Sequence, residues 1–252
     1  PLVVMTGANE MVKAQASLRS GAQDYLLRDE INPSLLVRSL RYARERKIIE
    51  QELRLALKAT VRRNQELERL SRHDPLTGLP NRRLFDETAT RKIERARHSG
   101  NVLALLYFDI SGFKKVNDVY GHAVGDCLLR EVSDAVGRKL ADEDTLARIG
   151  GDEFVVLTRP LSSSAHAYPI ATRVIEAIRE PFLIRDRTIE VSANVGIATF
   201  PESGSLELLV RHADIAMFEA KKKRDHFPQF YTRSLERHYH RLVSIERALP
   251  TS

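Results

Sequence analysis

With 252 residues, 42% of them apolar and 29% charged, the chain is able to bury one or two hydrophobic cores, which excludes a disordered protein. Its longest apolar runs are too short to span a bilayer and no basic-then-apolar leader opens it, so we expect no membrane segment. The single cysteine, Cys127, excludes an internal disulfide and fits a reducing cytoplasm, and the start at Pro1 suggests a piece of a longer protein.

Residues 1–35 have the pattern of a strand, a helix, a strand and the start of another helix. The segments are PLVVMT, then NEMVKAQASLRSG with Gly21 as a helix C-cap, then AQDYLLR. They resemble the last portion of a response-regulator receiver domain, with Thr6 at the switch-threonine position and Arg28 where a lysine is usual. So short a segment cannot bury a core unaided, and we expect it to pack on something else or to be loosely held.

Residues 36–72 are expected to form one long helix, since the stretch lacks Gly and Pro and is rich in Leu, Arg, Glu, Gln and Ala. Within residues 37–72, eleven Lys or Arg against five Glu account for the whole net charge of +6. A solvated basic helix and a parallel dimerising helix both stay open. Nucleic-acid binding is not expected, because the interleaving of aromatic and basic residues typical of single-strand sites is missing. Apolar or small residues at spacings of four and three form an imperfect coiled-coil seam, broken by Arg63: Ile49, Leu53, Ala56, Thr60, Leu67 and Leu70.

From HDPLTGLPNRR onward, strand and helix patterns alternate, which predicts a single α/β domain over residues 73–233. The apolar run NVLALLYFDIS is expected to form a central strand that is buried on both faces and delivers Asp109 at its end. A helical stretch follows it and continues through residues 127–140. TLARI and FVVL, on either side of Gly150 and Gly151, indicate a β-hairpin, because glycine accepts the positive φ of a tight turn.

The tip of this hairpin presents two adjacent carboxylates, Asp152 and Glu153. It comes near Asp109 if the two strands lie side by side. Three carboxylates without a matching lysine in the local sequence indicate a hard cation, and Mg²⁺ is commonly held by one or two carboxylates plus substrate phosphates. From spacing alone, an acidic turn that is merely solvated is the alternative.

Four motifs in register resemble the GGDEF diguanylate cyclase family over about residues 72–232. They are DPLTGLPNRR at 74–83, DISGFKKVNDVYGHAVGD at 109–126, RIGGDEF at 148–154 and ADIAMFEAKK at 213–222. The resemblance implies an α+β sandwich similar to the palm of polymerases and of class III nucleotidyl cyclases, with a central mixed β-sheet flanked by helices. It also implies a cytoplasmic, Mg²⁺- or Mn²⁺-dependent condensation of two GTP into cyclic di-GMP plus two pyrophosphates.

The resemblance also assigns the residues that bind metal and carry out the reaction. Asp109, Asp152 and the backbone carbonyl of Ile110 match metal ligands of the family. Glu153 matches the other acidic residue of the signature, which acts in metal binding or in activating the ribose hydroxyl.

Substrate binding is assigned in the same way. Asn117 and Asp126 match the residues that recognise guanine, a role that suits an amide and a carboxylate facing a base edge. The remaining matches are residues around the triphosphate and the signature glycines: Phe113, Lys114, Lys221, Gly150 and Gly151. Each domain can hold only one GTP and the product is two-fold symmetric, so the resemblance implies a homodimer of GGDEF domains, with the long helix setting their distance.

Two departures from the family pattern keep an alternative of another class open. Ser111 stands where a second aspartate is frequent, and KKKRDHF replaces the usual KxxGRN, which leaves Arg224 as the nearest arginine for a phosphate. The alternative is a catalytically inactive, GTP-binding regulatory module that controls an attached phosphodiesterase. Residues 234–252, a predicted helix containing HRLVSIERALP, resemble the lead-in to an EAL phosphodiesterase domain.

Many cyclases of this family bind their own product at an Arg-x-x-Asp site. Here Asp144 supplies the aspartate, but Ala141 stands at the arginine position. Alanine cannot supply the charged fork that recognises phosphate, so we expect weak or absent product inhibition through this site.

Overall fold

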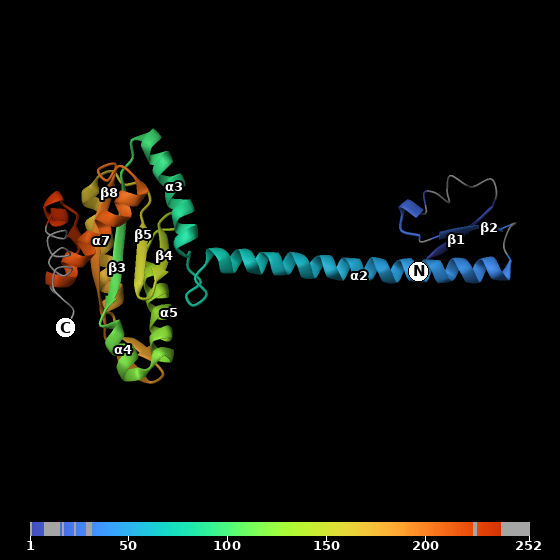
Figure 1. Ribbon diagram of the computed structural model, residues 1–252, viewed down its shortest axis with the longest axis horizontal. Helices are drawn as coiled ribbons and strands as arrows, with labels where there is room; N and C mark the ends of the chain where they lie inside the picture. The colour runs from blue at the N-terminus through green and yellow to red at the C-terminus, as the bar shows by residue number, and fades with distance from the viewer. Residues whose placement is uncertain are drawn as a thin grey trace, which may run out of the picture. The chain divides into compact units, whose positions relative to one another are not determined.

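The computed structural model describes residues 2–7, 16, 18–22, 24–28, 32–223 and 226–237, and the chain divides into two compact units, 1–68 and 69–252 (Figure 1). In the first unit, β1 (Val3–Thr6) and β2 (Asp24–Leu27) pair in parallel. This pairing agrees with the predicted strand, helix, strand order. Most of the helix predicted between the two strands and Arg224 lie outside the described residues. Of the helix predicted over 234–252, residues 234–237 are helical and the rest lie outside the described residues.

The long helix α2 runs over Pro33–Arg72, so the predicted helix is confirmed and begins slightly earlier than expected. Its start has an ordinary cause: the Asn32 side chain accepts a hydrogen bond of 2.8 Å from the amide of Leu35, and proline fits the first helical position. Of the predicted seam, Ile49 and Leu53 are 62% and 68% exposed. Across the described part of the chain, none of the helices combines the length and the apolar character needed to cross a membrane.

The second unit is built on a mixed five-stranded sheet with the strand order β4-β5-β3-β8-β9. β8 and β9 pair in parallel and the other neighbours are antiparallel. This confirms the predicted fold class. The strands are β3 (Leu103–Ser111), β4 (Thr145–Gly150), β5 (Glu153–Leu157), β8 (Ser192–Phe200) and β9 (Gln229–Phe230).

Helices cover both faces of this sheet (Figure 1). Side chains of α3 (Arg82–Ser99) and α7 (Leu206–Lys223) form one hydrophobic cluster with alternate residues of β3, among them Leu105 and Tyr107. Side chains of α5 (His122–Lys139) and α6 (Ala167–Arg179) form a second cluster with the intervening residues, among them Leu106 and Phe108. Burial on both faces explains why the sequence of β3 is a continuous apolar run rather than an alternating one.

The segments around the end of β3 fold as short, tightly turned pieces. α4 (Phe113–Tyr120) begins after Gly112, and Gly121 separates it from α5, so the predicted helical stretch is two helices. Both glycines have a positive φ, 86° and 83°, which explains why the chain uses glycine at these turns. The remaining elements are the hairpin β6 (Phe182–Ile184) and β7 (Arg187–Ile189) and a 3₁₀ turn, Ser164–His166.

The predicted hairpin around the two glycines is confirmed as β4 and β5. Only Gly151 has a positive φ, of 52°, and the pairing register shifts between Arg148 and Gly150. On the other side of β5, Glu153 pairs with Asp109 of β3. The hairpin therefore brings its acidic tip to the carboxyl end of the central strand.

Candidate active site

Asp109 is buried at the end of β3, with 3% of its surface exposed. Both carboxylate oxygens have a partner. Asn194, opposite it on β8, donates from Nδ2 to Oδ1 at 2.7 Å, and Lys221 of α7 donates from Nζ to Oδ2 at 2.7 Å. The structure thus places Lys221, predicted at the triphosphate, against a predicted metal ligand.

Glu153 lies across from Asp109 and is held by the central strand. The Tyr107 hydroxyl donates to its Oε2 at 2.9 Å. Burial, with the hydrogen bond and the negative charge of Glu153, raises the pKa of Tyr107. The phenol therefore stays a donor and fixes one oxygen of Glu153.

Asp152 is partly buried beside these groups. Burial raises its pKa, and the negative charges of Asp109 and Glu153 raise it further, while Lys221 opposes the shift. The pKa of Lys221 is raised in turn, first by its hydrogen bond to Asp109 and then by the charges of all three carboxylates. Like charges are therefore crowded at the hairpin tip, and a bound cation would relieve their repulsion.

A fourth carboxylate, Asp214, adds negative charge near Asp109 and Glu153. It lies on α7, about two turns before Lys221. Its pKa is raised by burial first and by the charge of Glu153, against the opposing charge of Arg82. Among the residues that the structure describes, however, no three acidic, histidine or cysteine side chains gather closely enough to hold a metal alone. The donor set therefore fits Mg²⁺ or Mn²⁺ held by one or two carboxylates and the Ile110 carbonyl, with phosphate oxygens completing the shell.

Arg148, whose side chain is only 11% exposed, supports the hairpin of β4 and β5 through hydrogen bonds. It donates from Nη1 to Oδ1 of Asp74 at 2.8 Å and from Nε and Nη2 to the Gly151 carbonyl at 2.9 and 2.7 Å. Thr77 also donates to Asp74 through its amide and hydroxyl, at 2.9 and 2.7 Å. Burial alone would raise the pKa of Asp74, but these hydrogen bonds outweigh it and the pKa is lowered.

The predicted guanine site has an unsatisfied polar atom. Oδ1 of Asn117, on α4, is buried with no hydrogen-bond partner. It packs against Gly125 of α5 so closely that a Cβ at Gly125 would lie 1.9 Å from this oxygen and 3.3 Å from Cζ of Phe113. Asp126, the next residue, is exposed. Because a buried acceptor without a donor is costly, this corner suits a ligand that brings N–H groups, as a guanine edge does.

The start of α4 offers a place for phosphate. No side chain caps this helix, and its first turn contains Phe113 and the exposed Lys114. Uncapped amides at a helix N-terminus attract anions. β3 therefore delivers Asp109 and the anion-attracting helix start within a few residues of each other.

Lys222 and Lys223, which follow Lys221, each have a partner other than the acidic residues of the site. Lys222 places its ammonium 4.2 Å from the centre of the Phe218 ring, and Lys223 donates to Oε1 of Gln229 at 2.6 Å.

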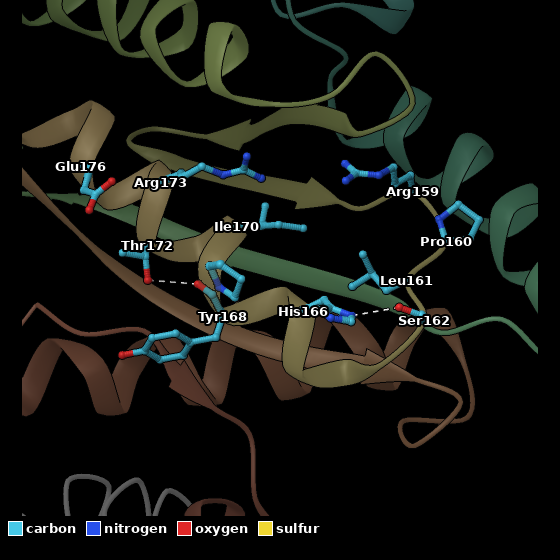
Figure 2. Close-up of a pocket in the computed structure, with 11 residues that line it drawn as sticks. Arg159, Pro160, Leu161, Ser162, His166, Tyr168, Ile170, Thr172, Arg173 and Glu176 are labelled. Atoms are coloured by element: carbon cyan, nitrogen blue, oxygen red, sulfur yellow. Dashed lines mark hydrogen bonds between the residues drawn. The ribbon is translucent and has the colours of Figure 1, made fainter.

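A cavity of about 740 Å³ lies along the 3₁₀ turn and α6. Figure 2 shows Arg159 and Arg173 reaching over it from opposite sides. None of the predicted site residues lines it. Asp144 serves this region as a structural acceptor: it receives the amides of Arg159 and Ala141 at 2.7 and 2.9 Å, and its side chain is fully buried.

Residues 71–226 match the family model described as diguanylate cyclase, GGDEF domain. The bifunctional diguanylate cyclase/cyclic di-GMP phosphodiesterase MucR of Pseudomonas aeruginosa is 41% identical over 174 residues, 68% of this chain and 25% of MucR. The cyclic di-GMP phosphodiesterase PdeR of Escherichia coli is 44% identical over 163 residues, 64% of this chain and 24% of PdeR. The chain thus spans about a quarter of these relatives.

A solved structure gives the same result for the fold. The GGDEF domain of TpbB (YfiN) from Pseudomonas aeruginosa superposes with a TM-score of 0.65 and 36% identity, covering 67% of this chain and 99% of that domain. The family model matches residues within the second unit and leaves the segment before residue 71 unmatched.

Sequence reasoning missed four residues that shape the site: Tyr107, Arg148, Asn194 and Asp214. Arg148 and Asp214 stand inside motifs that were recognised, RIGGDEF and ADIAMFEAKK, and their charge was the available signal. Tyr107 stands in an apolar run, so its sequence context predicts only a core residue. Asn194 carries no local signal, since its role exists only through the pairing of β8 with β3.

Proposed function

The chain belongs to the GGDEF domain family, and we propose that it is a diguanylate cyclase module that condenses two GTP into cyclic di-GMP plus two pyrophosphates. One observation carries the proposal. The sheet sets Asp109 against Glu153, and α4, which starts four residues after Asp109, holds a buried Asn117 oxygen that lacks a donor. The carboxylates of Asp109 and Glu153 and the proposed guanine-binding residue Asn117 therefore all lie near the start of α4.

We assign the following roles to the residues that bind the nucleotide. Asn117 and Asp126 hold the guanine edge, and the amides at the start of α4, with Phe113 and Lys114, hold the phosphates. Gly150 and Gly151 add no side chain to the turn, and no neighbouring atom lies within 4 Å of the place where their Cβ would be, which leaves room for a nucleotide.

Asp109, Asp152 and the Ile110 carbonyl would hold Mg²⁺ or Mn²⁺, which when bound neutralises charge on the phosphates. Glu153 either completes that shell or takes the proton of the attacking ribose 3′-hydroxyl. Tyr107 donates to one of its oxygens, which orients the carboxylate for either role.

Turnover requires a second copy of the chain. One domain holds one GTP, and a two-fold symmetric product needs each 3′-hydroxyl to reach the α-phosphorus of the opposite nucleotide. The helix α2 supports this arrangement, because Ile49 and Leu53 expose apolar side chains at the predicted seam. We therefore propose a homodimer formed through α2 and the GGDEF domains.

A GTP-binding regulatory module without turnover is the second candidate. One observation favours it: PdeR, named a phosphodiesterase, is 44% identical over the matched region. In that case Asn117 and α4 would bind GTP while the acidic corner would not catalyse its conversion.

One experiment separates the two candidates. Purified protein is incubated with GTP and Mg²⁺, and both protein-bound nucleotide and free cyclic di-GMP are followed by chromatography. A cyclase releases cyclic di-GMP and pyrophosphate in a ratio of one to two. Retention of intact GTP with no product would favour the regulatory module, and failure to bind GTP would contradict both candidates.

A further inference from the structure

The two oxygens of Asp109 are held by partners of different kinds. Oδ1 accepts from a buried, neutral amide, that of Asn194, which is 3% exposed. Oδ2 accepts from the ammonium of Lys221, whose side chain is 59% exposed. One partner is fixed in the core and the other can move into solvent.

Asn194 is fixed by the sheet itself. It stands opposite Asp109 in the antiparallel register of β3 and β8, so its amide reaches the carboxylate without a loop or a long side chain. A neutral donor orients a carboxylate without cancelling its charge. Such outer partners set the direction in which a ligand oxygen points.

Lys221 has the opposite properties. It lies in the last turns of α7, it brings a full positive charge, and it is mostly solvated. The Asn194 amide directs Oδ1 toward β8 in the core, whereas Oδ2 faces the side from which the largely solvated Lys221 reaches it. Oδ2 is therefore the oxygen that an incoming cation meets first, and Lys221 contacts that same oxygen.

We infer that Asn194 is a positioning residue that presents Oδ2 of Asp109 to a divalent cation, and that Lys221 competes with the cation for that oxygen. Lys221 therefore leaves Asp109 when the cation binds, and its charge becomes available to phosphate. The inference rests on the proposed function only in taking Asp109 as a metal ligand. It predicts opposite effects of the two neighbours on metal affinity.

The test measures Mn²⁺ binding by electron paramagnetic resonance in the full chain without nucleotide. The site counted is the one that Asp109→Asn removes. Lys221→Met keeps an unbranched side chain, one heavy atom shorter, and removes its charge. We expect about threefold to tenfold tighter Mn²⁺ binding, the size of a partly solvated ion pair. Lys222→Met is the matched control and should leave the affinity unchanged, because Lys222 lies over the Phe218 ring.

Asn194→Ala should move the affinity the other way, with Mn²⁺ binding weakened about tenfold. Thermal unfolding checks that this variant is folded, and Asn194→Ser, which keeps a donor on β8, should recover part of the loss. If Asn194→Ala does not fold, Lys221→Met still tests whether Lys221 competes with the cation. This variant should fold, since the exposed side chain of Lys221 at the end of α7 contributes little to folding.

Equal affinities in the Lys221→Met and Lys222→Met proteins would overturn the inference, and so would the absence of any Mn²⁺ site that depends on Asp109. A folded Asn194→Ala protein with unchanged affinity would remove the role of Asn194. The metal-binding test does not depend on turnover. If the Mn²⁺ affinities change as predicted but no cyclic di-GMP forms, only the cyclase proposal is contradicted. If cyclic di-GMP forms but the Mn²⁺ affinities do not change as predicted, only this inference is contradicted.

Discussion

Arg148 and Asp74 form a largely buried ion pair of 2.8 Å between residues 74 positions apart, and the same guanidinium holds the Gly151 carbonyl at the hairpin tip. The DPLTG loop and the acidic turn are thus joined through one side chain. This linkage needs a planar guanidinium, because all three of its nitrogens donate hydrogen bonds at the same time.

Arg148→Lys should therefore lower both stability and turnover. Lysine keeps the charge but cannot serve Asp74 and the Gly151 carbonyl together, and we expect a loss of about 1–3 kcal/mol in the free energy of unfolding. Urea unfolding measures it. Arg83→Lys is the matched control, since the exposed Arg83 pairs with Glu87 at 3.4 Å and an exposed pair contributes about 0–1 kcal/mol. Equal losses in both variants would contradict the bracing role.

Gly125→Ala should weaken GTP binding at least about tenfold, because the new methyl group would displace the Asn117 amide that it meets at 1.9 Å. Equilibrium dialysis with GTP measures this. Gly137→Ala, on the same helix, has no neighbouring atom within 4 Å and should be neutral or stabilising by about 0.4–1 kcal/mol. GTP affinity unchanged in Gly125→Ala would mean that Asn117 does not read the base.

Leu53→Glu should weaken self-association, because it puts a charge into the predicted seam of α2. Leu55→Glu is a close control: the two leucines are 68% and 66% exposed, but only Leu53 is at a seam position. Sedimentation of both variants over a range of concentrations compares them. Turnover per molecule should fall on dilution sooner in Leu53→Glu than in the parent. Identical sedimentation of the two variants would place the dimer contact elsewhere.

Asp144→Ala should destabilise the domain by about 1–3 kcal/mol rather than relieve product inhibition, because it removes the acceptor for the Arg159 and Ala141 amides. Thermal unfolding measures the first effect. Initial rates with added cyclic di-GMP measure the second, and we expect weak or no inhibition in the parent. Strong inhibition that Asp144→Ala abolishes would show that the side chain binds product.

Local patterns were enough to predict the main elements of the second unit. The apolar run ending at Asp109 indicates a strand buried on both faces, and the glycine pair indicates a hairpin, because both signals depend on neighbouring residues alone. The site's supporting contacts could not be predicted in this way. Lys221 and Asn194 meet Asp109 from 112 and 85 residues away, and only the pairing of the strands and the packing of α7 bring them there.

The metal ligands, catalytic residues and nucleotide contacts stay predictions, and turnover by matched aspartate variants tests them most directly. Asp152→Asn removes a charge at the hairpin tip, and Asp118→Asn removes one from an exposed position on α4. With GTP and Mg²⁺, we expect cyclic di-GMP from the parent and from Asp118→Asn, and a loss of at least about 100-fold in a folded Asp152→Asn protein. Cyclic di-GMP formed by Asp152→Asn at the parent's rate would contradict the proposed active site.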